Sequence, residues 1–206
     1  MPSPEIILAS SSKYRRALLD KLGLDKLGLD KSAKGYRGVA PEVDEQPLPG
    51  EAPAALVERL AIAKARAVAQ SHPEALIIGS DQVASIDGQI LGKPGNHQAA
   101  IAQLERLSGR QVCFLTGLCV LNAKTDQTQS CCDPFWVSFR HLTREKIVNY
   151  LEREQPYDCA GAFKSEGLGI ALFSRLEGED PNSLIGLPLI RLVAMLEREG
   201  VDILKA

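Results

Sequence analysis

The sequence has few aromatic residues and no long apolar run. Aromatic residues make up 5% of the 206 positions, with a single Trp, so we expect no platform of stacked rings for single-stranded nucleic acid. No uninterrupted apolar stretch approaches the roughly 20 residues of a membrane-spanning helix. Residues 1–16 also lack a basic stretch followed by a long apolar one, and we therefore expect no secretory signal.

The chain also lacks a surplus of either charge. It has 24 basic and 26 acidic residues, for a formal net charge of −2. Proteins drawn to nucleic acid or anionic membranes by overall charge usually carry a basic surplus. We expect neither a membrane partner nor stable nucleic-acid binding, although a local basic pocket is compatible with this balance.

Cysteine and histidine patterns typical of metal sites are missing too. The five cysteines form no C-x-x-C pair and lie mostly in strand-like sequence, and the three histidines are scattered. Free thiols in a reducing cytoplasm are the simpler interpretation, with redox or metal chemistry as the alternative. The spacing disfavours a zinc enzyme. The motifs G-x-S-x-G, G-x-x-x-x-G-K-[ST] and G-x-G-x-x-G are also absent, which disfavours a serine hydrolase, a P-loop NTPase and a dinucleotide-binding fold.

What is present is typical of an ordinary globular chain: 45% hydrophobic and 24% charged residues. No linker divides it, so we predict one domain over residues 1–206. Apolar periodicity predicts strands and helices interleaved along the chain, which favours an α/β fold with a mixed sheet. The predicted strands cover 5–9, 75–87, 111–122 and 129–142, with strand pieces in a Gly-rich loop over 159–171. The predicted helices cover 13–22, 51–71, 97–109, 143–153 and 187–199.

The first candidate site is the segment SSSKYRR at 10–16. Hydroxyls and free N–H groups at a helix start, with two guanidinium groups just inside it, suit polyphosphate oxygens. Ser10, Arg15 and Arg16 are the phosphate-binding candidates. The alternative is a capped surface helix with solvated basic residues.

Two acidic segments could supply catalytic carboxylates. The segment PEVDE at 41–45 could hold a divalent ion, since Mg²⁺ takes a few carboxylate oxygens together with water and phosphate; otherwise it is a solvated acidic loop. Asp81 follows the apolar run LIIGS and would lie at the end of a strand, where it could activate water or bind metal. The alternative role for Asp81 is to cap a turn.

Two lysines and one loop complete the candidates. Lys64 lies in an Ala-rich helix, where a snorkelling surface lysine is the common case. Lys93 lies between Gly92 and Pro94 and could present a point charge to phosphate. In the segment 159–169 three glycines permit close approach of a ligand, and Lys164 and Glu166 bring charge.

The order of these segments resembles the Maf-like nucleotide pyrophosphatase family over nearly the whole chain. The matching segments are ILASSSKYRRALL, PEVDE, ERLAIAKA, IIGSDQV, ILGKP, LSG, TGL, CAGAFKSEG and GLPL. The resemblance implies an elongated mixed β-sheet flanked by helices, with two lobes and a central cleft. It implies hydrolysis of nucleoside triphosphates to monophosphate and pyrophosphate, a house-cleaning role, a divalent metal (Mg²⁺, Mn²⁺ or Co²⁺) and a homodimer.

The resemblance also implies roles for single residues. Asp81 would activate water for attack on the α-phosphorus, and Glu45 would hold the metal with Asp81 and with help from Asp44. Phosphate charge would be neutralised by Ser10, Arg15, Arg16, Lys64 and Lys93.

Within the family the chain is most similar to the 7-methyl-GTP pyrophosphatase subgroup. Specificity would rest on Tyr14, Gln82 and Glu166, where other subgroups carry Arg, Thr and Gln. The subgroup usually has Trp where this chain has Tyr14, which keeps an aromatic ring. A cationic 7-methylguanine suits rings and a carboxylate. Glu166 can accept from guanine N–H groups, and Gln82 can both donate and accept.

Other functions stay open at this point. A Maf-like enzyme of another subgroup would prefer dTTP, UTP or another nucleotide, and a nucleotide-binding regulator of cell division would not need turnover. The repeat LDKLGLDKLGLD at 19–30 is longer than the family requires. We expect it to extend a loop or helix end beside the site, because its period of five fits neither helix nor strand.

Overall fold

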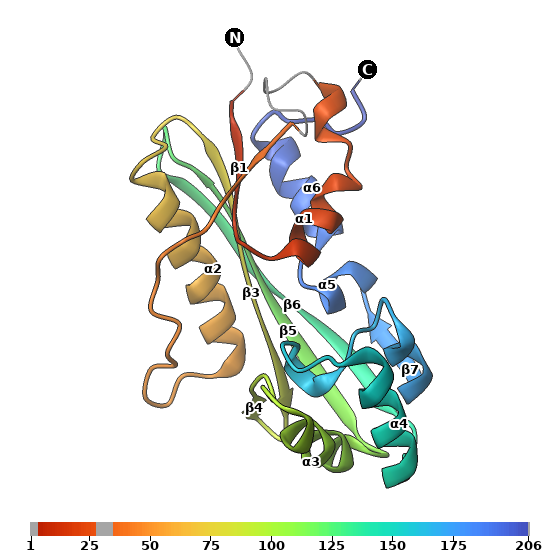
Figure 1. The fold of residues 1–206 in the computed structure, drawn as a ribbon. Helices are drawn as coiled ribbons and strands as arrows, with labels where there is room; N and C mark the ends of the chain where they lie inside the picture. Colours follow the sequence, from red (N-terminus) through yellow and green to blue (C-terminus); the bar gives the residue numbers. More distant parts are fainter. Residues whose placement is uncertain (1–3, 28–34, 206) are drawn as a thin grey trace.

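The computed structural model describes residues 4–27 and 35–205. Strands and helices alternate along much of the chain (Figure 1). The strands are β1 (Ile6–Ala9), β2 (Arg37–Val39), β3 (Leu76–Ile86), β4 (Gln89–Leu91), β5 (Gln111–Asn122), β6 (Gln127–Phe139) and β7 (Phe173–Gly178). The α-helices are α1 (Lys13–Asp20), α2 (Pro53–Ala69), α3 (His97–Leu107), α4 (Arg144–Glu154), α5 (Pro181–Ile185) and α6 (Leu189–Arg198). Three short 3₁₀ helices are η1 (Leu24–Leu27), η2 (Ala160–Ala162) and η3 (Leu168–Leu172).

The strands form one mixed sheet, as predicted. Its order is β2-β1-β3-β5-β6-β7, with β4 paired to β3 outside this path. β1 runs parallel to β2 and β3, and the remaining pairs are antiparallel. The predicted strands 111–122 and 129–142 correspond to β5 and β6, which form a long hairpin paired from Gln111↔Ser138 to Asn122↔Gln127.

Part of β3 has no strand partner on one side within the described residues, and the candidate site lies at this gap. β1 pairs with β3 only as far as Ala9↔Gly79, and β4 joins β3 from Ala84 onward. Residues 80–83 of β3 therefore lack a strand partner on the side opposite β5, among the pairs described. Asp81 thus lies in the middle of β3, and the prediction that it lies at that strand's end was wrong. The strand that ends there is its parallel neighbour β1.

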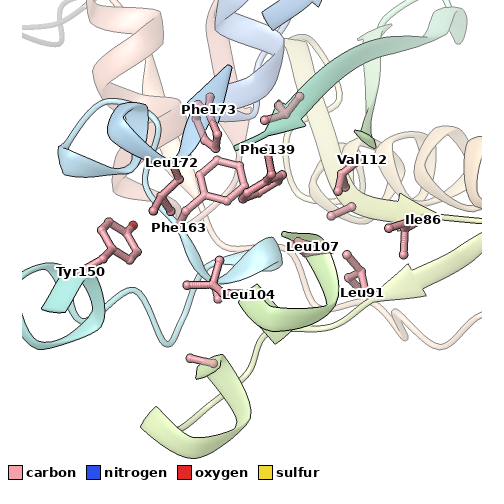
Figure 2. Packing of buried hydrophobic residues seen from close by; sticks show 14 of the residues in the cluster. Ile86, Leu91, Leu104, Leu107, Val112, Phe139, Tyr150, Phe163, Leu172 and Phe173 are labelled. Atoms are coloured by element: carbon pink, nitrogen blue, oxygen red, sulfur yellow. The ribbon is translucent and has the colours of Figure 1, made fainter. Parts of the chain in front are cut away.

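Helices cover the sheet on both faces. α2 lies against one face, α1 and α6 lie against the other, and α3 and α4 gather at the far end of the long strands (Figure 1). The helix-covered faces and the far end each bury their own apolar cluster. In the far-end cluster Phe163 packs edge-on against Phe139 and Phe173, at centroid distances of 5.7 and 4.8 Å (Figure 2). It packs in the same way against Phe114, at 5.2 Å. Phe163 thereby anchors the loop that carries Glu166.

Two glycines let α2 approach the sheet closely. A Cβ on Gly79 of β3 would lie 2.1 Å from the carbonyl oxygen of Ala61, and one on Gly117 of β5 would lie 2.0 Å from that of Val57. Any larger residue would push the helix away. Small residues on both sides thus place α2, and with it Lys64, directly over β3.

Capping and turn residues in the sequence mark the ends of several helices and strands. Asn96 caps α3 through its side chain, and Thr143 caps α4 in the same way. The turn from β3 to β4 has positive φ at both Asp87 and Gly88, as a two-residue hairpin requires.

Two regions differ from the prediction. Residues 159–171 hold no strand; they form η2 and η3 joined by a loop, and the strand β7 begins only at Phe173. α5 was not predicted either, because five residues are too few to show a helical period. The pair Asp180–Pro181 is nevertheless a start signal, since Asp180 caps the helix and Pro181 is its first residue.

The described part of the repeat at 19–30 is not continuous helix. α1 ends at Asp20, Gly23 has a φ of +61°, and η1 follows. Residues 28–30 lie outside the described residues. Leu19 and Leu24 are buried in the apolar cluster under α1 and α6, and none of residues 19–27 lines the cleft described below. The expectation that the repeat borders the site is therefore wrong for this part of it. Among the described residues, no helix combines the length and apolar character needed to cross a membrane.

Candidate active site

A cleft of about 880 Å³ opens beside the gap in the pairing of β3. Residues far apart in the sequence line it, from the turn between β1 and α1, the loop before α2, α2 itself, β3, the loop 158–166 and the end of α5. Apart from Asp44, the predicted site residues all lie in its wall: Ser10, Tyr14, Arg15, Arg16, Glu45, Lys64, Asp81, Gln82, Lys93 and Glu166.

A buried lysine joins the two key carboxylates. Lys64 is 6% exposed, and its Nζ lies 2.6 Å from Asp81 Oδ1 and 2.6 Å from Glu45 Oε1. Because a buried ammonium needs paired charge, a snorkelling surface role is excluded for Lys64. Its bond to Glu45 holds the pKa of that carboxyl below the ordinary value, with further help from Lys93 and Arg15. An ammonium has three protons, so one remains beyond these two bonds.

The turn after β1 supplies a hydroxyl and two guanidinium groups. Ser12 caps α1 by accepting from Arg15 N. Ser10 Oγ accepts from Ser12 N at 3.1 Å and lies 3.5 Å from Arg15 Nη1. Arg15 Nε donates to the carbonyl oxygen of Gly186 at 2.9 Å, which ties the turn to α5. Arg16 is exposed and donates to Ser11 O. This local bonding fits the alternative of a capped surface helix, whereas the position of Arg16 in the cleft wall fits phosphate binding.

The loop that carries Glu45 is tied to α2 by a separate ion pair. Arg59 of α2 binds both carboxylate oxygens of Glu51, at 2.6 and 2.8 Å, and donates to the carbonyl of Gln46 at 3.1 Å. Asp44 accepts from Gln46 N within the same loop and does not line the cleft. The expected help of Asp44 in metal binding therefore has no support from its position.

We call Ser10, Arg15, Arg16, Lys64 and Lys93, with Glu45 and Asp81 between them, the basic end of the cleft. The acidic end consists of Tyr14, Asp158 and Glu166, and Gln82 lines the cleft from β3, next to Asp81. The charged neighbours that shift the pKa differ between the two ends. The pKa of Tyr14 is raised to about 12 by burial and then by Cys159, Asp158 and Glu166, whereas Glu45 senses Lys64, Lys93 and Arg15.

Asp158 of the acidic end was not among the predicted site residues, and Cys159 was predicted only as the start of the Gly-rich segment. Asp158 and Cys159 line the cleft beside Tyr14, and Lys13 Nζ lies 5.2 Å from the centroid of the Tyr14 ring. Lys164 lines the cleft, but its ammonium donates to the carbonyl of Glu154 and closes the end of α4. No motif marks Asp158; the only signal was its place just before the Gly-rich segment.

The basic end offers few metal ligands. Over residues 4–27 and 35–205, no three His, Cys, Asp or Glu side chains form a group that could hold a metal by themselves. Glu45 and Asp81 are two carboxylates close enough to share one ammonium. This set fits Mg²⁺, which commonly binds one or two carboxylates and completes its shell with water and substrate phosphate.

The chain matches the sequence profile of the family described as Maf-like protein over residues 5–199. The chain belongs to the Maf-like protein family. This Maf-like protein is 54% identical to a 7-methyl-GTP pyrophosphatase of Alcanivorax borkumensis, over 98% of its own length and 97% of that relative. It is 52% identical to proteins of the same name from Nitrosococcus oceani, over 98% and 96% of the two chains, and from Pseudomonas aeruginosa, over 97% and 99%.

Among solved structures, a protein of Vibrio cholerae overlaps 96% of this Maf-like chain and 93% of its own. The TM-score is 0.44 and the identity 13%. This similarity is too low to bear on the site.

Proposed function

We propose that this Maf-like protein is a nucleoside triphosphate pyrophosphatase that hydrolyses 7-methyl-GTP to the monophosphate and pyrophosphate. The observation that carries the proposal is the pair Glu45 and Asp81, bound to the buried Lys64 inside a cleft whose basic end suits a polyphosphate. Relatives at 50–54% identity over nearly the whole chain carry this name. The acidic end gives the substrate preference a physical basis, because 7-methylguanine is a cation.

In this mechanism a water attacks the α-phosphorus in line with the bond to the bridging oxygen. Asp81 accepts the proton of that water, a contribution typically worth about 10²–10⁴ in rate. The new P–O bond forms as the bond to the bridging oxygen breaks, and pyrophosphate leaves with the electron pair. Ser10, Arg15, Arg16 and Lys93 stabilise the charge on the phosphate oxygens, which is the main demand of such a transfer.

Lys64 has a double role in the proposal. It is bonded to both carboxylates, so it holds Asp81 and Glu45 close together, and its remaining proton is available to a phosphate oxygen. A divalent metal held by Glu45 and Asp81 would neutralise phosphate charge and polarise the phosphorus.

The surroundings of the enzyme are a further part of the proposal. We place it in the cytoplasm, in line with five free cysteines; burial raises the pKa of Cys119 to about 12, as suits an inert thiol. A homodimer and the absence of stable nucleic-acid binding remain predictions.

A nucleotide panel tests the proposal. Pyrophosphate release is measured for 7-methyl-GTP, GTP, dTTP and UTP with Mg²⁺, Mn²⁺ or Co²⁺, and without metal after chelation. We expect the highest kcat/KM for 7-methyl-GTP and loss of turnover on chelation. A preference for dTTP or UTP would move the enzyme to another subgroup, and no turnover with any nucleotide would refute the enzyme itself.

A further inference from the structure

The side-chain amide of Gln82 is bonded inside the protein on one side only. Gln82 Nε2 donates to the carbonyl oxygen of Ser183 at 2.7 Å, to Thr116 Oγ1 at 2.9 Å and to the carbonyl oxygen of Leu184 at 3.2 Å. Both N–H groups are therefore used by these acceptors, the third contact being shared.

This bonding decides which way the amide points. Rotating the amide by 180° would bring Gln82 Oε1 against the carbonyl oxygen of Ser183, and neither oxygen has a proton to share. Thr116 gives no relief, because its hydroxyl already donates to the same carbonyl at 2.9 Å. The acceptor Oε1 is thus the atom that remains on the cleft side.

The acceptors that hold the amide are themselves held. Thr116 is fully buried and pairs with Gln82 across the strands β3 and β5. Ser183 is fully buried as well, and its hydroxyl donates to Asp133 Oδ1 at 2.9 Å. Asp133 in turn binds Arg191 at 3.2 Å. A buried polar network satisfied in this way keeps one arrangement.

Gln82 lines the cleft, and none of the hydrogen bonds described within residues 4–27 and 35–205 uses its Oε1. We infer that Gln82 contacts the nucleobase as an acceptor only, and that Thr116, which does not line the cleft, is the positioning residue that keeps it so. The expectation that Gln82 both donates and accepts is corrected by this bonding.

The inference deepens the proposed function and rests on it. Gln82 and Glu166 line the same cleft; with Glu166 as a second acceptor, the cleft suits a base that presents adjacent N–H donors, such as N1–H and the 2-amino group of guanine. Methylation at N7 gives the ring a positive charge and makes both groups stronger donors. A base that offers only an acceptor at this place meets an unpaired oxygen, and such mismatches support strong discrimination.

The decisive experiment combines base analogues with a variant in a cycle. Calorimetry gives the affinity of wild type and Gln82→Met for 7-methyl-GMP, for 7-methyl-IMP, which lacks the 2-amino donor, and for 1,7-dimethyl-GMP, which lacks N1–H. We expect wild type to bind at least one analogue about tenfold more weakly than 7-methyl-GMP. Gln82→Met should bind that analogue and 7-methyl-GMP with similar affinity. Gln129→Met is the matched control, because Gln129 also donates to a backbone carbonyl but lies outside the cleft.

Thr116 is tested separately. Thr116→Val should shrink the wild-type difference between 7-methyl-GMP and the analogue about threefold, and Thr116→Ser, which keeps the hydroxyl, should restore it. Equal differences in wild type and Gln82→Met would overturn the inference, as would selective loss in wild type with a base lacking only the O6 acceptor. A Thr116→Ser variant as impaired as Thr116→Val would remove Thr116 from the positioning role.

The proposed function and the role of Gln82 are refuted by different outcomes in this design. Monophosphate binding needs no turnover, so binding with the expected pattern but no pyrophosphate release would refute the proposed function and keep the role of Gln82. Turnover of 7-methyl-GTP without the pattern would refute the role of Gln82 alone. No binding of any guanine nucleotide would overturn both.

Discussion

The two ends of the cleft are built by different means. At the basic end the groups come from the capped start of α1, from α2 and β3, and from the loops that carry Glu45 and Lys93, and the ion pairs of Lys64 join three of them. Of the predicted specificity residues, Glu166 lies at the acidic end in a loop between two 3₁₀ helices, and Gln82 is held by backbone carbonyls of the short α5. Ion pairs thus hold together the groups proposed for the transfer chemistry, while the groups proposed for base selection depend on hydrogen bonds to backbone carbonyls and on a loop anchored by Phe163.

The strand β3 carries both a proposed catalytic residue and a proposed specificity residue. Neighbouring residues of a strand point to opposite faces, so Asp81 faces Lys64 of α2 while Gln82 faces Thr116 and Ser183. Both reach the cleft because residues 80–83 have no strand partner on that side, among the pairs described. Chemistry and selectivity should therefore separate in variants, and the predictions test this separation.

The largest effect is expected at the basic end. Asp81→Asn keeps the shape of the side chain and removes the base, so kcat should fall by about 10²–10⁴ for every nucleotide, with the ratio between 7-methyl-GTP and GTP unchanged. Pyrophosphate release measures both quantities. Asp87→Asn is the control, since Asp87 lies in the β3–β4 turn outside the cleft. Full turnover by Asp81→Asn would exclude Asp81 as the base.

A smaller and more selective effect is expected at the acidic end. Glu166→Gln removes a negative charge that is felt at Tyr14, so the preference for 7-methyl-GTP over GTP should fall about tenfold, equal to about 1.4 kcal/mol. The kcat for GTP should stay close to that of wild type. Glu177→Gln, on β7 away from the cleft, serves as the control. An unchanged preference would show that this carboxylate does not select the base.

The smallest effect concerns the loop that carries Glu45. Arg59 lowers the pKa of Glu51 to about 2, below its ordinary value of 4.5. A carboxyl with a lowered pKa in the folded state stabilises the fold above its unfolded pKa, and this contribution is lost as pH falls toward the folded one. The free energy of unfolding of wild type and Glu51→Gln should therefore differ at about pH 6 and converge toward about pH 2.

Denaturant titrations at several pH values measure this difference. Glu105→Gln removes an exposed carboxylate that pairs with Arg144, and it should have little effect, since exposed pairs contribute little. A constant difference between wild type and Glu51→Gln over the whole range would contradict the assigned ion pair.

The sequence by itself determined the mixed α/β class, most elements of the fold and the ten candidate residues in the cleft wall. Periodicity and capping side chains act over a few residues, so Asn96 and Thr143 mark helix starts without reference to the rest of the molecule. The family resemblance rests on an ordered series of short segments, which the sequence contains in full.

Only the tertiary structure decided how these residues act together. Lys64 is buried between Glu45 and Asp81 because Gly79 and Gly117 let α2 approach the sheet, a contact between segments far apart in the sequence. The acceptor role of Gln82 depends on Thr116 and on carbonyls about 100 residues away. Backbone carbonyls exist at every residue and leave no mark in the sequence, so only folding could show which of them holds the amide.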